Sequence, residues 1–411
     1  MADGGFGGQG ITAEPVAAIP DGLVAGSPAY RRVSAILFVA GLSTFASLYC
    51  VQPLMPDFTR VFGITPAESS LALSLSTGVL AVAMLVAGMI SDRFGRKPIM
   101  AVSLLASGTL GILGALAPDW GWLLGLRALE GLALSGLPAV AMAYVSEEVE
   151  PRSAGLAMGL YIGGTAVGGM SGRAVTALVA DLVNWRAALA VVGAIGILGA
   201  VAVWLWLPAS KRFVRSSMSV RDMAAAWRRH LGDGGLRALF AMGFVAMGSF
   251  VTVFNYVGFR LVAPPFDLRP ALVGAVFLVY LLGAVSSPVF GGLAGRLGHG
   301  KVLAAATALM AAGLALMSPD SLWAVTPGIA LFTVAFFGMH STTSAWIGQR
   351  ATTNRGQASA IYLFCYYMGS TIAGTLGGVF WHGYGWPGVA GFVGVIVTAG
   401  LALSLALARR G

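Results

Sequence analysis

Charged side chains are scarce in this sequence of 411 residues. Asp, Glu, Lys and Arg make up only 10% of the chain, whereas hydrophobic residues make up 57%. A soluble globular protein carries about 25% charged residues. The composition therefore excludes a soluble globular fold.

Cysteine is rare, and the motifs of common catalytic sites are missing. The two cysteines, Cys50 and Cys365, lie in apolar stretches of opposite halves, so they indicate neither a disulfide framework nor a metal site. No phosphate-binding loop, Ser-His-Asp pattern or metal-ligand spacing occurs. We therefore expect neither an ATP-driven pump nor an enzyme, and no cofactor or metal.

Long apolar runs occupy most of the chain. Each is long enough to cross a bilayer as a helix, and the 58 glycines are small residues that let membrane helices pack closely. The pattern predicts an all-α membrane protein with twelve transmembrane helices in contact with the lipid bilayer. The predicted spans are 33–55, 70–90, 98–117, 121–145, 154–179, 186–207, 237–260, 271–294, 301–317, 322–346, 357–380 and 386–408.

The longest polar stretch between runs divides the chain in two. The predicted domains are a disordered cytoplasmic tail (1–32), an N-terminal six-helix bundle (33–207), a cytoplasmic linker (208–236) and a C-terminal six-helix bundle (237–411). In the linker, Val220, Met223, Trp227 and Leu231 recur at near-helical spacing among arginines. This predicts a basic amphipathic helix on the inner leaflet. A solvated linker with one helical turn is the alternative.

The two halves repeat each other. A shift of 203 residues (291 minus 88) carries Gly88 onto Gly291 and Gly95 onto Gly298. The same shift carries Asp92 onto a glycine, so the second copy of this loop lacks the carboxylate. A repeat at half the chain length indicates duplication and predicts two pseudo-symmetric bundles.

The net charge of +9 lies in short loops between apolar runs. This distribution is typical of the positive-inside rule rather than of nucleic-acid binding. Counted loop by loop, nineteen lysines and arginines lie on one side of the membrane and four on the other. Both termini are therefore predicted to be cytoplasmic.

A tight basic turn joins the second and third spans. It contains Gly88, Asp92, Arg93, Gly95, Arg96 and Lys97 in the order G-x-x-x-D-R-x-G-R-K. This pattern between two apolar runs resembles the signature loop of the major facilitator superfamily. The resemblance implies the major facilitator fold and transport by alternating access between the two bundles. A generic basic loop of an unrelated membrane protein is the alternative.

We predict that this loop latches the bundles together in the outward-facing state. Asp92 would meet the N-terminal end of the eleventh span near Arg355, where an anion is favoured. Arg96 would pair with Glu147 or Glu148 at the end of the fourth span.

Only three charged residues lie deep inside spans: Arg127 and Glu130 in the fourth, and Arg173 in the fifth. Charges inside a membrane are costly and usually functional. All three lie at similar depth, which predicts one polar cluster lining a cavity. Arg127 to Gly131 also resembles the superfamily's R-x-x-Q-G motif, with Glu130 in place of the amide. An ion pair that only holds helices together is the alternative.

We predict that Glu130 carries a coupling proton and that Arg127 controls its charge. No other carboxylate lies deep in a span. Burial favours the neutral carboxyl group, whereas a nearby guanidinium favours the carboxylate, so a change in either can move the proton. His340, a side chain of the type that titrates near neutral pH, is the rival carrier.

The candidate substrate cavity is assigned from rare polar side chains and aromatic residues within spans. These are Gln52, Arg173, Asn255, Tyr256, His340 and Tyr366. Because two arginines share a layer with one deep carboxylate, that layer has a net charge of +1 when Glu130 is ionised. We therefore expect a neutral, zwitterionic or anionic small molecule rather than a lipophilic cation.

The fifth span is rich in glycine. Gly164, Gly168 and Gly169 match the superfamily's G-P-x-x-G-G antiporter motif, except that Thr165 replaces the proline. Close helix packing alone also explains these glycines. Short runs around Gln52 and before Arg173 resemble bacterial drug and metabolite exporters of the acriflavine-sensitivity branch.

The resemblance implies a monomeric secondary transporter in the inner membrane of a bacterial cell. It would export a small molecule, a drug or metabolite, by antiport against protons. A proton symporter or uniporter that imports a sugar or organic acid is the first alternative. A non-transporting membrane sensor on the same fold is the second.

Overall fold

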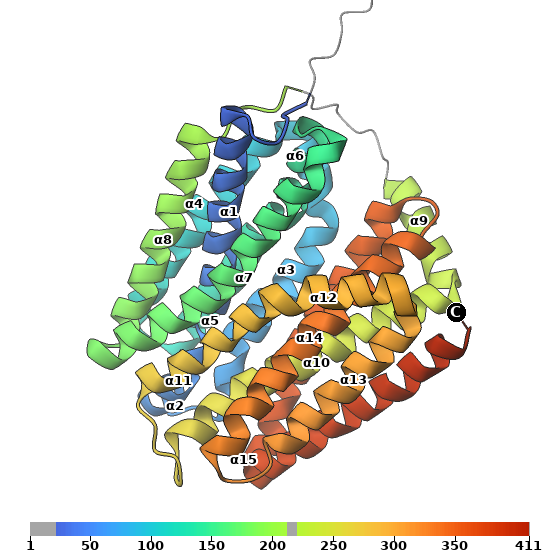
Figure 1. Cartoon of the computed structure of the whole chain (residues 1–411). Helices are drawn as coiled ribbons and strands as arrows, with labels where there is room; N and C mark the ends of the chain where they lie inside the picture. Colours follow the sequence, from blue (N-terminus) through green and yellow to red (C-terminus); the bar gives the residue numbers. More distant parts are fainter. Residues whose placement is uncertain (1–21, 212–219, 411) are drawn as a thin grey trace, which may run out of the picture.

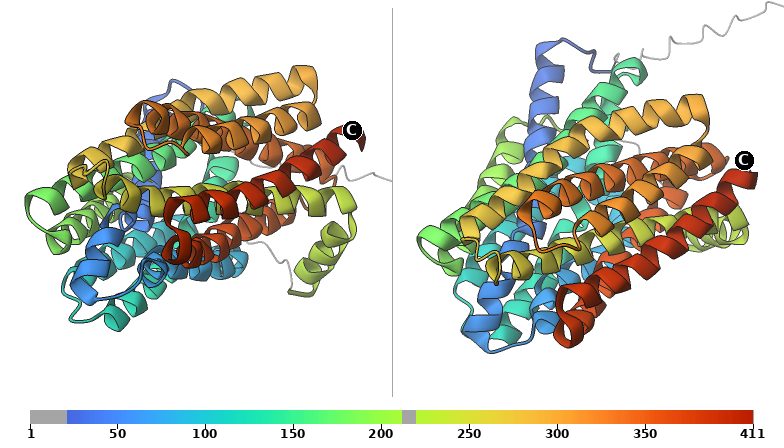
Figure 2. Two further views of the ribbon diagram at one scale, coloured as in Figure 1. Left: turned by 90° about the horizontal axis from the view of Figure 1, so that it is seen from below. Right: turned by 60° about the horizontal axis from the view of Figure 1, so that its bottom comes forward.

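Helices make up nearly all of the described chain. The structure, a computed structural model, describes residues 22–211 and 220–410, without the side chains of residues 87–93, 151, 220, 284 and 410. Ten stretches of the described residues are long and apolar enough to cross a membrane, and the last of them, Arg355–Arg409, contains two of the predicted spans. The predicted all-α membrane fold is confirmed, and its two halves lie side by side (Figures 1 and 2).

Every predicted span coincides with a helix or with a pair of consecutive helices. The first half contains α1 (Pro28–Tyr49), α2 (Met55–Phe62), α3 (Pro66–Phe94), α4 (Arg96–Ala115), α5 (Trp120–Leu134), α6 (Gly136–Glu148), α7 (Pro151–Leu182) and α8 (Trp185–Trp206). The second half contains α10 (Gly234–Val262), α11 (Pro270–Val276), α12 (Tyr280–Leu297), α13 (His299–Leu316), α14 (Leu322–Arg350) and α15 (Arg355–Arg410), with the linker helix α9 (Val220–Gly232) before them.

Several spans are broken, and proline or glycine accounts for three of the breaks. Helix α1 ends at Tyr49 because Pro53 has no N–H for the Tyr49 carbonyl, and a short 3-10 turn, η1 (Gln52–Leu54), leads into α2. Pro138 has the same effect at Leu134, where α5 gives way to α6. The last two spans lie within α15, which is interrupted at Gly385, where φ is 60° and the backbone is not helical.

Helices α1 and α7 pack backbone to backbone. A Cβ atom on Gly164 would overlap the carbonyl of Phe38, and one on Gly168 would overlap that of Leu42. Gly172, which the sequence did not single out, lies in the same way against Ala46. Three glycines at four-residue spacing on one face of α7 therefore set the close approach of the two helices.

We expect Gly168→Ala to destabilise this contact. The added methyl group meets main-chain atoms that cannot rotate away, and overpacking of this kind costs about 1–3 kcal/mol. The thermal unfolding midpoint of the purified protein in detergent measures the effect. Gly159→Ala is the matched control, because open space surrounds Gly159 on the same helix. Equal midpoints for the two variants would contradict the close packing.

The internal repeat is visible in the backbone. Gly95, at the start of α4, has a φ of +91°, and its repeat partner Gly298, at the start of α13, has a φ of +90°. Residues with a Cβ atom rarely adopt this conformation. The same strained turn therefore joins the second helix to the third in each half.

The first helix begins inside the region 1–32 that the sequence predicted to be a disordered tail. Ser27 caps α1, which begins at Pro28 and so before the predicted residue 33, because a Ser cap and an early proline start a helix even where arginines follow. Leu23 forms a parallel bridge with Val149. Residues 1–21 of the predicted tail lie outside the described part of the chain.

Helix α9 is the amphipathic helix predicted for the linker. Its buried face, with Met223 and Ala226, packs against α10 and α15 of the second half. The Trp227 indole N–H donates to Gln357 at 2.7 Å, and His230 lies 3.3 Å from the Asn354 carbonyl. Protein therefore covers part of the apolar face, whereas Leu231 is 47% exposed, and contact of this helix with the inner leaflet stays a prediction.

Candidate functional site

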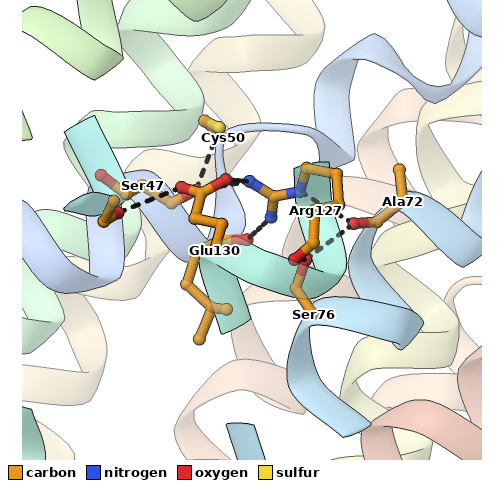
Figure 3. A network of polar contacts seen from close by, with 8 residues as sticks. Ser47, Cys50, Ala72, Ser76, Arg127 and Glu130 are labelled. Carbon is orange, nitrogen blue, oxygen red and sulfur yellow. Dashed lines mark hydrogen bonds and ion pairs between the residues drawn. The ribbon is translucent and has the colours of Figure 1, made fainter. Parts of the chain in front are cut away.

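Arg127 and Glu130 form an ion pair inside the first half (Figure 3). They lie one turn apart on α5, and the exposed fractions of the two residues are 3% and 2%. The Arg127 guanidinium also donates to the carbonyls of Ala72 at 2.9 Å, Ser47 at 3.2 Å and Leu48 at 2.8 Å. The guanidinium thus joins α5 to α1 and α3 as well as to Glu130.

The position of Arg127 follows from the break in α1. Carbonyls in the last turn of a helix have no partner within the helix, and a cation is favoured there. Arg127 supplies donors to two of them, on Ser47 and Leu48. In return, Ser76 on α3 donates to the Arg127 carbonyl at 2.8 Å. Arg127 therefore holds the broken end of α1 in place.

The Glu130 carboxylate has a second donor and a small space beside it. Ser107 on α4 donates to it at 3.2 Å. A cavity of about 10 Å³, lined by Glu130, Arg127, Ser47 and Cys50 among others, adjoins it. This is room for about one water molecule. The carboxylate therefore borders a small space that protein atoms do not fill.

Arg173 does not join this ion pair, so the prediction of a single three-charge cluster is wrong. Its guanidinium donates to the side-chain oxygen of Gln52 and to the carbonyl of Gly169. Its carbon lies 4.3 Å from the ring centre of Tyr49 and 4.7 Å from that of Tyr280. Arg127 and Arg173 contact successive turns around residues 47–52 but point to different neighbours.

Gln52 joins the two halves of the molecule. Its side-chain amide donates to Asn255 on α10, with an Nε2–Oδ1 distance of 2.6 Å. The two residues are separated by 203 positions, the length of the repeat, so they are equivalent residues of the two halves. Sequence reasoning named both for the cavity but missed their contact, although the repeat contained the signal.

A second contact between the halves lies on α3 and α15. The hydroxyls of Thr77 and Thr371 are 3.0 Å apart, and Thr371 also donates to the Ser74 carbonyl at 3.0 Å. The repeat shift carries Thr77 onto Tyr280, whose ring lies against Arg173. These two equivalent positions therefore both lie at contacts between the halves.

The remaining cavity candidates separate into two groups. His340 lies half-buried, with Nδ1 2.8 Å from the Tyr362 hydroxyl and its ring centre 4.8 Å from that of Tyr366. Tyr256 instead donates to the Gly374 carbonyl at 2.8 Å and stacks on Trp381. His340 and Tyr366 therefore lie side by side, as a shared cavity requires, whereas Tyr256 joins α10 to α15.

Known proteins identify this architecture. The sequence profile of the Major Facilitator Superfamily matches residues 37–263 and 245–410. The chain belongs to this superfamily. It is 46% identical over 385 residues to the inner membrane transport protein YnfM of Escherichia coli, covering 94% of this chain and 92% of that protein. It is 44% identical over 385 residues to the uncharacterized MFS-type transporter YybF of Bacillus subtilis, covering 93% and 95%.

A solved superfamily structure has the same fold. The bacterial homologue of the human lysosomal transporter Spinster, in an inward-facing and occupied conformation, aligns with a TM-score of 0.77 and 15% identity, covering 93% of this chain and 98% of that one. With the bacterial relatives, this makes the chain a multi-pass membrane transporter and not an enzyme.

The superfamily's signature loop is only partly described. Arg96 donates to Glu147 with both Nε and Nη2, at 3.2 and 2.6 Å, and Lys97 lies 5.7 Å from the ring centre of Trp204. Both contacts stay within the first half. Arg355 donates to the Ala351 carbonyl in the second half. Residues 87–93, which include Gly88, Asp92 and Arg93, are described without their side chains, and Glu148 is buried. The latch stays a prediction.

Proposed function

We propose that this transporter exports a small molecule by antiport against protons and that Glu130 carries the proton. One observation supports the proposal above the others. The buried Arg127–Glu130 pair is bonded to the end of α1, and the same short segment carries Gln52 into the contact between the halves. A change of charge at Glu130 therefore acts on a residue that closes the transport path.

The coupling follows from what Arg127 can bond. While Glu130 is ionised, Arg127 is held between the carboxylate and the carbonyls of Ser47 and Leu48. Protonation removes the charge that attracts Arg127, so the carbonyls of α1 and α3 must hold the guanidinium alone. The segment from Ser47 to Gln52 then shifts relative to α5, and the contact of Gln52 with Asn255 weakens.

The orientation predicted from lysine and arginine counts places the Gln52–Asn255 contact on the outer side of the membrane. This state then faces the cytoplasm with its outer side closed and Glu130 paired with Arg127. An antiporter releases its proton to the cytoplasm and loads its cargo in that state. The ion pair is therefore the deprotonated form from which export begins.

Proteoliposomes with a pH-sensitive dye inside test this proposal. A panel of carboxylates, neutral amides and amines is added, and proton and solute movement are recorded with and without a proton gradient. Opposite movement of proton and solute supports export by antiport. Movement in the same direction identifies a symporter, solute flux without protons a uniporter, and binding without flux a sensor. Each of these last three results contradicts the proposal.

We expect Asp92→Asn to lower transport without lowering insertion into the membrane. The proposed latch needs a negative charge at the start of the eleventh span, where the helix dipole favours an anion. Flux in proteoliposomes, divided by the amount of inserted protein, measures the effect. Normal flux from this variant would exclude the latch.

A further inference from the structure

Arg173 differs from the other buried arginines of this protein. Arg96, Arg127 and Arg260 are each at least nine-tenths buried, and each forms an ion pair with a carboxylate. Arg173 is the most buried of the four, with an exposed fraction of 2%, yet no carboxylate of the described residues pairs with it. A buried charge without a counterion is costly. Its persistence indicates that a partner arrives from elsewhere.

Several polar groups around Arg173 also lack a hydrogen-bond partner among the described residues. The hydroxyls of Tyr49 and Tyr280 and the side-chain N–H₂ of Asn255 are buried and have no hydrogen-bond partner among the described residues. Both tyrosine rings lie against the Arg173 guanidinium, and Asn255 is bonded to Gln52, which Arg173 also contacts. Unsatisfied buried polar groups are rare, and each requires an explanation. Here several donors surround one cation, and an anion would satisfy them together.

We propose that Arg173, Tyr49, Tyr280 and Asn255 form the binding site for the carboxylate of an aromatic or otherwise apolar small molecule. This proposal rests on the transport function proposed above and names its substrate class. A carboxylate matches the forked donors of a guanidinium and accepts from phenol hydroxyls as well. The surrounding aromatic side chains suit an apolar body, and they include Phe277, whose ring centre lies 5.3 Å from the Arg173 guanidinium carbon.

The proposed ligand would compete with the hydrogen bond between Arg173 and Gln52. A bound carboxylate competes with the Gln52 oxygen for the same guanidinium. Loading of the site therefore releases Gln52 from Arg173 and weakens its hold on Asn255 across the two halves. Binding of the substrate and opening of the outer contact are thereby linked.

The charge arrangement excludes a cation as ligand. Glu130, the one deep carboxylate that the sequence offers, is already paired with Arg127. The site near Arg173 thus has a full positive charge and donors that point to no acceptor. A cation would meet repulsion, and a neutral amide would leave the charge uncompensated.

Three molecules of nearly equal shape test the proposal: benzoate, benzamide and benzamidinium. Their binding to the full-length protein in nanodiscs is measured by tryptophan fluorescence and by isothermal titration calorimetry. We expect benzoate to bind and the other two to bind at least roughly ten-fold more weakly, because a hydrogen bond to a charged group is worth more than a neutral one. Arg173→Gln should remove benzoate binding.

Two further variants separate a loss of benzoate binding from a loss of the folded structure. Tyr280→Phe removes a hydroxyl that has no partner, so it should leave thermal stability unchanged while weakening benzoate binding. Arg269→Gln, on the exposed start of α11, is the matched loss of a positive charge and should bind benzoate normally. Unchanged benzoate binding in Tyr280→Phe and Arg173→Gln would overturn the assignment.

Other outcomes separate this inference from the transport proposal. Displacement of benzoate by chloride or phosphate at equal concentration would show a site for small inorganic anions, and tighter binding of benzamidinium would show a cation site. Either overturns the carboxylate assignment. Proton-driven flux of a neutral compound that does not compete with benzoate would keep the transport proposal and overturn this one. Arg173-dependent benzoate binding without any proton-coupled flux would keep the carboxylate site and overturn the transport proposal.

Discussion

Glu130→Gln is expected to abolish proton-driven transport and to leave substrate binding and gradient-free exchange intact. Glutamine keeps the shape of the side chain and can still accept from Ser107 and Arg127, but it cannot release a proton. Arg127 retains its three carbonyl partners, so its charge stays solvated by the backbone. Flux against a gradient and counterflow exchange, measured in the same proteoliposomes, separate the two activities.

His340→Ala is the comparison variant for this experiment. His340 is bonded to Tyr362 and lies beside Tyr366, and among the described residues it bonds to neither Arg127 nor Glu130. It should therefore keep proton-driven flux. If Glu130→Gln still expels substrate against a gradient and His340→Ala does not, the proton belongs to His340. If both variants pump, neither residue carries it.

Arg127→Met is expected to have the largest effect on stability. Methionine is long enough to fill much of the space but donates no hydrogen bond. The variant leaves three backbone carbonyls and the Glu130 carboxyl without their partner. Removal of one member of a buried ion pair costs about 3–5 kcal/mol. We expect a clear drop in the thermal unfolding midpoint and in the amount of monodisperse protein.

A double-mutant cycle tests whether the pair acts as a unit. In Arg127→Met with Glu130→Gln, no buried charge remains, so the double variant should be more stable than Arg127→Met alone. It should stay less stable than the natural protein, because the carbonyls of Ser47, Leu48 and Ala72 lose the Arg127 donors, although Cys50 still donates to Ser47 and Ser76 to Ala72. Additive losses from the two changes would show that the ion pair contributes no coupling energy.

Most of the fold was predictable because a membrane leaves little choice. Backbone polar groups have no water to bond within the bilayer, so each long apolar run must be a helix. The turns at Gly95 and Gly298 were predictable as a matched pair, since duplication preserves the backbone shape that glycine permits. The early start of α1 was missed because the charges of Arg31 and Arg32 outweighed the cap at Ser27 in a hydropathy argument.

The candidate site was predictable in its residues but not in its contacts. Arg127, Glu130 and Arg173 stand out by charge alone, and their depth follows from the rise of about 1.5 Å per residue in a helix. Depth does not say which way a side chain points around the helix axis. That direction depends on packing, which turns Arg127 toward the end of α1 and Arg173 toward the aromatic rings of the other half.

The sequence by itself determined the membrane class, the twelve spans, the repeat and the identity of the deep charges. Hydropathy, glycine spacing and charge are local properties, and they act wherever the residue stands in the chain. Only the tertiary structure decided that Arg127 reaches the broken end of α1, that Arg173 has no counterion among the described residues, and that Gln52 meets its repeat partner Asn255. These contacts join residues far apart in the chain, and their existence depends on how the helices rotate and approach when the two halves assemble.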